Sequence, residues 1–414
     1  MATGGRKLRV RRLGGTRAGE IRLTRFLRNE AVTVGEMLQE AAERTAGRCA
    51  GRHVLAIQDT TVLQSTGGGG AYLHAMVAVD AEDGALLGLI DSQFLERTAG
   101  RRAERRAIGI EEKESFRWLE GADQAASVCA GAASVTVIAD RESDIFEAFA
   151  LRASSVGLVV RAAHDRSVQD AQTLFAAIDA VAEAGRADLD LPARPGRRKR
   201  TARLSIRFMP VRLSRPRYGQ RADLPASVDL FLVDIRETDP PTGEAPIHWR
   251  LLTTHIVSTL EQAWGVAELY RRRWIIEQLF RTLKTQGFDV EDLRIEEPTP
   301  RHRLVMASLI AAVCIQQLVH ARDGGPGPLR PALDAFEPED TKFLEACCIT
   351  LEGKTQRQKN PHPKGSLAYA AWVCARLGGW TGYYGKPGPV VMLQGWLEFH
   401  AMKRGAELVT KHLQ

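Results

Sequence analysis

Residues 270–284 read YRRRWIIEQLFRTLK, and this stretch indicates more about function than any other part of the chain. We take it as one helix, which turns about 100° per residue. An apolar stripe then predicts packing against a core; its members are Leu269, Ile276, Leu279, Phe280 and Leu283. The neighbouring face carries Tyr270, Arg273, Glu277 and Lys284. A carboxylate binds a hard cation, and the other groups bind phosphate oxygens, so this face fits a metal ion beside a phosphate. The alternative is a solvated helix with internal ion pairs.

Size and composition describe a globular protein that has a modest positive charge. The 414 residues allow two or three domains, the hydrophobic content is 44%, and the net charge is +7. No cysteine pair has a C-x-x-C spacing, so the six cysteines predict a reducing compartment rather than a disulfide framework. The longest apolar stretch, 304–319, includes Ser308 and Gln316. It therefore predicts a buried helix, and we expect no membrane association.

The order of predicted elements indicates an α/β fold. Residues 1–19 predict a flexible basic tail, and 20–47 predict helices that break near Asn29. Strands follow at 53–60, 71–82, 85–96, 135–139 and 157–162, with a hairpin turn at Asp83-Gly84 and helices at about 110–130 and 142–152. This order predicts a mixed sheet with helices on its faces. A helix at about 169–184 then precedes strands at 203–214, 228–236 and 247–254, and residues after 259 are mainly helical.

Three carboxylates occupy positions that a metal-dependent site requires. Asp59 and Asp140 lie at the ends of predicted strands, and Glu277 lies on the later helix. Three converging carboxylates can hold two divalent ions for phosphoryl transfer. The alternative for each aspartate is a turn or a helix N-cap, because each precedes a segment that needs one.

Several motifs resemble those of DDE transposases in the insertion-sequence-four family, which are bacterial cut-and-paste enzymes. The pattern Tyr270-x2-Arg273-x3-Glu277-x6-Lys284 resembles the YREK motif of that family. Segments 57–61 (IQDTT) and 140–145 (DRESDI) resemble its two aspartate motifs. Further likeness occurs, in the family's order, in residues 113–118, 249–253, 294–298 and 375–379.

The resemblance implies an RNase H-like mixed sheet with helices on both faces, interrupted by a mostly antiparallel β insertion and followed by a helical C-terminal region. It implies that Asp59, Asp140 and Glu277 bind two Mg²⁺ or Mn²⁺ ions per active site. It assigns DNA contacts to Tyr270, Arg273 and Lys284, and base stacking to Trp249; alternatively, Trp249 is a buried strand residue. The expected domains are a partial N-terminal helical DNA-binding region at 1–50, core segments at 51–164 and 256–322, the β-rich insertion at 165–255, and a dimerisation region at 323–414.

Basic clusters fit a DNA partner, since Lys and Arg gain affinity by releasing counterions from phosphates. One group lies in the insertion: Arg197, Arg198, Lys199, Arg200, Arg203 and Arg207. Another comprises Arg101, Arg102, Arg105 and Arg106. Arg161 and His164 resemble DNA-contacting positions of the family. Solvated surface charge is the alternative for each member.

The implied function is cut-and-paste transposition in the bacterial cytoplasm, at the nucleoid. The partners are double-stranded DNA, as terminal inverted repeats and target, and a second copy of the chain on DNA. The family's N-terminal recognition region is represented only by its end, at residues 25–29, and the loop Gly67–Gly70 has no counterpart. Two other functions stay open: a truncated copy that is inactive or inhibits by binding DNA, and a structure-specific nuclease on the same core.

Overall fold

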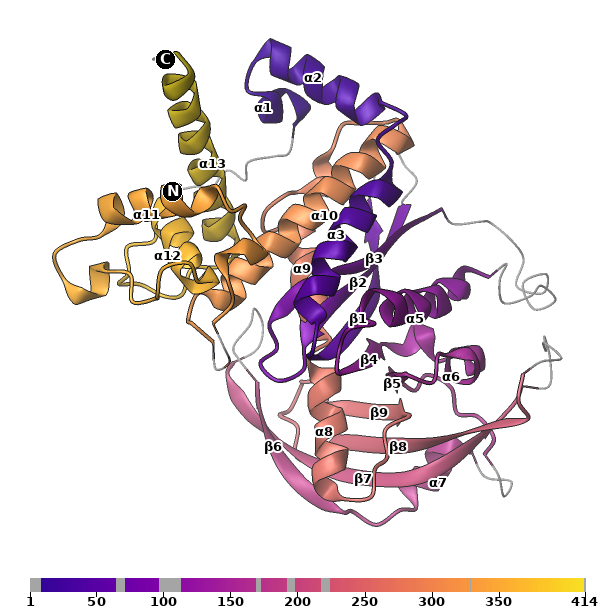
Figure 1. Cartoon of the computed structure of the whole chain (residues 1–414). Coiled ribbons are helices and arrows are strands. Elements are labelled where there is room, and N and C mark those ends of the chain that lie inside the picture. Colours follow the sequence, from indigo (N-terminus) through magenta and orange to yellow (C-terminus); the bar gives the residue numbers. More distant parts are fainter. Residues whose placement is uncertain are drawn as a thin grey trace.

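The computed structural model describes residues 9–64, 71–96, 113–168, 173–191, 198–216, 224–325, 327 and 329–412. The chain forms a mixed α/β structure with one nine-stranded sheet (Figure 1). The strand order is β3-β2-β1-β4-β5-β9-β8-β7-β6. The strands are β1 (His53–Leu63), β2 (Ala71–Asp80), β3 (Leu86–Glu96), β4 (Ser134–Ala139), β5 (Val156–Arg161), β6 (Gly185–Leu191), β7 (Arg200–Ser214), β8 (Ser227–Glu237) and β9 (His248–Thr253).

The central strands β1, β4 and β5 are parallel, and the remaining pairs are antiparallel. The insertion is antiparallel as predicted, but its strands extend the core sheet, because β9 pairs directly with β5. Strand β6 was not predicted. Its sequence, GRADLDL, includes three charged residues and alternates charged with apolar residues from Arg186 to Leu191, so a strand pattern was present and was overlooked.

Helices cover both faces of the sheet, as expected. One face packs against α5 (Arg117–Val128), α6 (Phe146–Leu151) and α7 (Leu174–Asp179). The other packs against α8 (Leu260–Arg271), α9 (Trp274–Lys284) and α10 (Pro298–Ala321). Adjacent β1 residues alternate between the two cores, since strand side chains point to opposite faces: Val54 and Ala56 join the first, and Leu55 and Ile57 the second.

The N-terminal segment is more ordered than predicted. Helix α1 (Val10–Gly14) leads through a glycine turn into α2 (Arg17–Arg28), where the Thr16 hydroxyl caps the first turn by accepting from the Gly19 amide. The tail prediction was therefore wrong from Val10 onward; for α2, the physical reason is the Thr16 cap, which starts a helix inside a Gly-rich stretch. Helix α3 (Val34–Cys49) follows, and the predicted break near Asn29 is confirmed.

The C-terminal region is helical, with α11 (Asp340–Leu351), α12 (Leu367–Leu377) and α13 (Pro389–His412) beside one end of α10 (Figure 1). Of the helices described, α10 alone is long and apolar enough to cross a membrane, and 67% of its 18-residue apolar stretch is buried inside the protein. Leu309, Ala312 and Ile315 are fully buried in it. This matches the prediction of a buried core helix.

Candidate active site

Strand register brings the two predicted aspartates together. In the parallel pair β1–β4, Ile57 lies opposite Ile138. Asp59 and Asp140 each follow two residues later, and residues two apart share one face of a sheet. Both aspartates therefore lie on the face of the second core. Glu277 reaches the same place because α9 buries Ile276 and Leu279 in that core.

The Arg273 guanidinium is the common partner of these three carboxylates. Its Nη1 lies 2.9 Å from Asp59 Oδ2, and its Nη2 lies 3.6 Å from Asp140 Oδ2 and 2.5 Å from Glu277 Oε1. The Arg273 side chain is only 9% exposed, so these attractions act in a poorly solvated setting, where charges interact strongly. The structure thus confirms that the three predicted acids converge, and it adds a cation at their centre.

The stretch 270–284 is not one continuous helix. Helix α8 ends at Arg271 and α9 begins at Trp274. Between them, the amides of Arg272 and Arg273 bond to carbonyls three residues earlier, at 3.2 Å and 3.0 Å. The single-helix prediction was wrong because nothing in three consecutive arginines marks a tight turn, as Gly or Pro would. The turn places Arg273 at the start of α9, one helical turn before Glu277.

Burial raises the pKa of Asp59 to about 6; Arg273 and the Thr60 amide oppose this rise, while Asp140 and Glu277 add to it. Burial lowers the pKa of Arg273, but Tyr270 and the three carboxylates together raise it above its ordinary value. The cluster therefore carries excess negative charge that one guanidinium only partly offsets. Binding of additional positive charge would therefore stabilise this site.

Tyr270 and Lys284 form hydrogen bonds with different elements around the site. The Tyr270 hydroxyl donates to Asp140 Oδ1 at 3.2 Å, and burial raises the pKa of this phenol to about 12, so it stays protonated. Lys284 Nζ donates to the Val62 carbonyl at 2.7 Å and pairs with Glu291 at 3.0 Å. Tyr270 is 1% exposed, so as placed it orients a carboxylate. DNA contact through Tyr270, Arg273 or Lys284 stays a prediction.

Tyr270→Phe removes the hydroxyl that orients Asp140. For the DNA cleavage that the sequence resemblance implies, we expect the rate to fall by roughly tenfold to a hundredfold, the range for residues that orient metal ligands. Steady-state cleavage assays measure this. Tyr369→Phe is the matched control, since Tyr369 is also buried but lies in α12 and bonds none of the three carboxylates. Equal rates for both variants would contradict an orienting role.

The other predicted DNA contacts are distributed more widely. Trp249 is half-buried, with its ring edge-on to Tyr270 at 5.6 Å between centroids. Arg161 lies 3.9 Å from Asp140 and donates to the His248 carbonyl.

Among the basic residues of the insertion, Arg200 differs from its neighbours: it pairs with Glu237 and Glu244 inside the insertion. Three predicted residues are exposed: His164, Arg198 and Lys199. Arg101, Arg102, Arg105, Arg106, Arg197 and the loop Gly67–Gly70 lie outside the described residues.

A buried network of hydrogen bonds beside Asp59 was not predicted from the sequence. The Thr60 hydroxyl bonds to His74 Nδ1 at 2.9 Å and accepts from Arg117 at 3.3 Å. His74 Nε2 lies 3.3 Å from Gln58 Oε1, and burial lowers the pKa of His74 to about 3, so the ring is neutral. A histidine within the apolar strand AYLHAMVAVD was the available signal.

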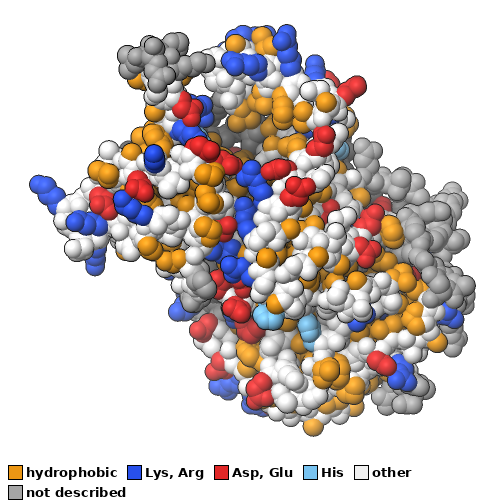
Figure 2. Space-filling model, viewed as in Figure 1, with side chains coloured by type: hydrophobic (Ala, Val, Ile, Leu, Met, Phe, Trp, Pro, Cys, Tyr) orange, Lys and Arg blue, Asp and Glu red, His pale blue; other side chains and the backbone are white. Residues whose placement is uncertain are grey.

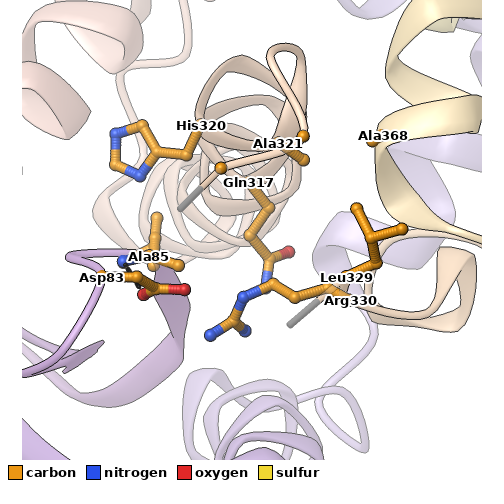
Figure 3. A pocket seen from close by; sticks show the side chains of 11 residues that line it. Asp83, Ala85, Gln317, His320, Ala321, Leu329, Arg330 and Ala368 are labelled. Atoms are coloured by element: carbon orange, nitrogen blue, oxygen red, sulfur yellow. Dashed lines mark hydrogen bonds between the residues drawn. The ribbon is translucent and has the colours of Figure 1, made fainter. Parts of the chain in front are cut away.

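A small cavity of about 30 Å³, room for a water or two, lies between the β2–β3 turn and the end of α10 (Figure 3). His320, Gln317 and Arg330 line it with buried atoms that lack a hydrogen-bond partner within the described residues. None of the three converging carboxylates lines it. It is therefore a candidate for buried water and separate from the candidate active site.

Metal binding at the carboxylates fits the chemistry of the donors. Oxygen ligands suit hard divalent cations, and the cluster already holds a cationic group. Within the described ranges, no three Asp, Glu, His or Cys side chains are close enough to form a ready-made metal site. The carboxylates are instead arranged around the guanidinium.

An RNase H-like sheet with acids at two adjacent strand ends and on a later helix defines a class of enzymes that cut and join nucleic acids. Residues 73–314 match the family model of the transposase DDE domain, over more than half of the chain. The chain belongs to this family of transposases, which generally use divalent metal ions. The matched range includes Asp140 and Glu277, and Asp59 lies before it.

Proposed function

We propose that the protein is a cut-and-paste transposase of the insertion-sequence-four type. It would cleave DNA at transposon ends and join the freed 3′-hydroxyls to target DNA. The observation that carries this proposal is the convergence of Asp59, Asp140 and Glu277 on Arg273. The YREK pattern supports the subfamily, since Tyr270, Arg273 and Glu277 meet at the carboxylate site. Lys284 bonds to β1 beyond Asp59, at Thr61 and Val62.

Asp59, Asp140 and Glu277 would hold the divalent ions, Mg²⁺ or Mn²⁺. Two such ions activate a nucleophile and stabilise the leaving oxygen. Tyr270 keeps Asp140 oriented, and the bond from Lys284 to the Val62 carbonyl keeps the end of β1 beside α9. Once divalent ions bind the carboxylates, the guanidinium of Arg273 would be free to bind a phosphate. Planar guanidinium groups suit such bidentate contacts.

DNA and a second copy of the chain are the proposed partners. Helices α1 and α2 belong to a segment, 6–28, with nine Lys or Arg and one Glu, which supports DNA binding by the N-terminal region. Exposed apolar side chains on α13, among them Val390 and Leu408, support a dimer contact in the C-terminal region.

Labelled duplexes that carry the inverted repeats flanking the gene test the proposal. Wild-type protein with Mg²⁺ is expected to yield nicked ends and, with target DNA added, joined products. Glu277→Gln has nearly the same shape and should yield neither. Cleavage without any joined product would instead identify a structure-specific nuclease. Equal cleavage by wild type and Glu277→Gln would refute the site assignment.

A further inference from the structure

A long part of the C-terminal region contains no acidic residue. Residues 353–397 include six Lys or Arg and no Asp or Glu, whereas the whole chain has 57 basic and 50 acidic residues. Such one-sided charge produces a positive local potential, which attracts polyanions. This segment lies beyond the part of the chain that matches the transposase family model.

Three of the six cations are already engaged. Lys364 pairs with Glu345 at 2.8 Å, and Lys386 pairs with Asp323 at 2.6 Å. Arg376 is half-buried and donates to the carbonyls of Leu351 and Trp380. The other three are exposed and have no ion pair within the structure described: Lys354, Arg357 and Lys359.

Two tyrosines lie beside these free cations on a loop with a fixed shape. The Tyr383 hydroxyl bonds to Thr355 Oγ1 at 3.3 Å. Trp380 Nε1 donates to the Gly385 carbonyl at 3.0 Å. Gly382 has a φ of 88° and approaches the Arg357 carbonyl so closely that a Cβ would lie 3.0 Å from it. The loop thus presents Tyr384, which is 85% exposed.

We name this surface the basic-aromatic face; it consists of Lys354, Arg357, Lys359, Tyr383 and Tyr384. Figure 2 shows Lys and Arg side chains gathered at the extremity of the C-terminal region, where Figure 1 places the chain between α11 and α12. The region projects from the body of the protein, which allows a long, extended partner to approach it.

We propose that the basic-aromatic face binds the sugar-phosphate backbone of duplex DNA, as a second DNA site apart from the carboxylates. Uncompensated cations bind phosphates by releasing counterions, and an exposed tyrosine adds a hydroxyl donor or a stacking ring. The five residues of the face include no carboxylate, and one exposed acid borders them, Glu352, which accepts from the Asn360 amide at 3.0 Å. The face forms no pocket among the pockets described, so we expect binding without sequence preference. The proposal rests on the proposed function, because it supplies a site for target or flanking DNA.

Binding of a 30-base-pair duplex without transposon ends, measured against salt and without divalent ions, tests this site. For Lys354→Gln/Arg357→Gln, we expect the slope of log affinity against log salt to become shallower by about 2, since each phosphate contact contributes about 0.9. Affinity at low salt should fall on the order of tenfold. Lys364→Gln/Lys386→Gln is the matched control, because it changes the net charge equally but removes cations that are already paired. Its slope should equal that of the wild type.

Tyr384→Ala should weaken binding by roughly five- to tenfold with an unchanged slope, since a neutral contact releases no counterion. Equal slopes for the two double variants and the wild type would overturn the proposal and leave the face for another acidic partner. This readout needs no catalysis, so Glu277→Gln should bind the duplex as the wild type does. Failure of end cleavage tests the proposed function, whereas an unchanged slope tests only this face.

Discussion

Asp59→Asn is expected to abolish most DNA cleavage and yet make the protein unfold at a higher temperature. Cleavage should fall roughly 100- to 1000-fold, as when one charge-stabilising group is removed from an active site. Stability should rise because burial and two neighbouring carboxylates make the charged form of Asp59 unfavourable, which raises its pKa from 3.8 to about 6. Arg273 would still pair with Asp140 and Glu277 in the variant.

The gain in stability should depend on pH with a definite sign. Below the unfolded pKa of 3.8, the carboxyl is protonated in both states and Asn offers no advantage. Above pH 6, the folded protein bears the full cost of the charge, of the order of a few kcal/mol. Thermal unfolding without divalent ions should therefore separate variant and wild type at pH 7.5 but not at pH 3.5.

Asp91→Asn provides the control for this prediction. Asp91 is also buried, and burial raises its pKa, but it bonds to Gln93 away from the cluster. It should share the stability gain and retain cleavage. A lower unfolding temperature for Asp59→Asn at pH 7.5 would show that the pair with Arg273 outweighs the cost of the buried charge.

Arg273→Gln is expected to have the opposite effect on stability. Among the residues that the structure describes, it removes the only partner shared by the three carboxylates, and breaking a buried ion pair from one side costs about 3–5 kcal/mol. The unfolding temperature without metal should fall, and cleavage should be lost. Added Mg²⁺ should recover more stability in this variant than in the wild type, because the ions replace the missing positive charge.

Two further variants isolate the cause. Arg273→Lys keeps the charge but cannot bond several carboxylates in a plane, so its stability should be intermediate. Arg273→Gln/Asp59→Asn removes one charge of each sign and should recover part of the loss, as a double-mutant cycle would reveal. If Arg273→Gln unfolds at the wild-type temperature without metal, the guanidinium does not stabilise the cluster.

The sequence predicted the sheet because its strands are apolar runs with strong turn signals. The hairpin at Asp83-Gly84 and the strands that precede Asp59 and Asp140 are such cases. Predicting that the acids converge also required the register of β1 and β4, in which Ile57 lies opposite Ile138. That register could not be predicted, because it is set by tertiary packing. Family resemblance substituted for that missing register.

Other features could not be predicted because local signals were weak or misleading. The break at Arg272–Arg273 has no Gly or Pro, and helical periodicity continues on both sides of it. The contacts of Arg273 depend on β1 and β4, which lie more than 130 residues earlier. Thr16 and Gly15 start and shape the N-terminal helices within a segment whose composition is typical of a tail.

The pairing of β9 with β5 has a consequence for how the gene can vary. Strand β5 is apolar on both faces, with Leu158, Val159 and Val160 all buried. A chain that lost residues 165–255 would expose this strand as a bare sheet edge, and unprotected edges of this kind recruit other chains and aggregate. The insertion is thus needed to keep the protein soluble, in addition to any contact that it makes with DNA. We therefore expect selection against deletions in this segment even in copies that no longer transpose.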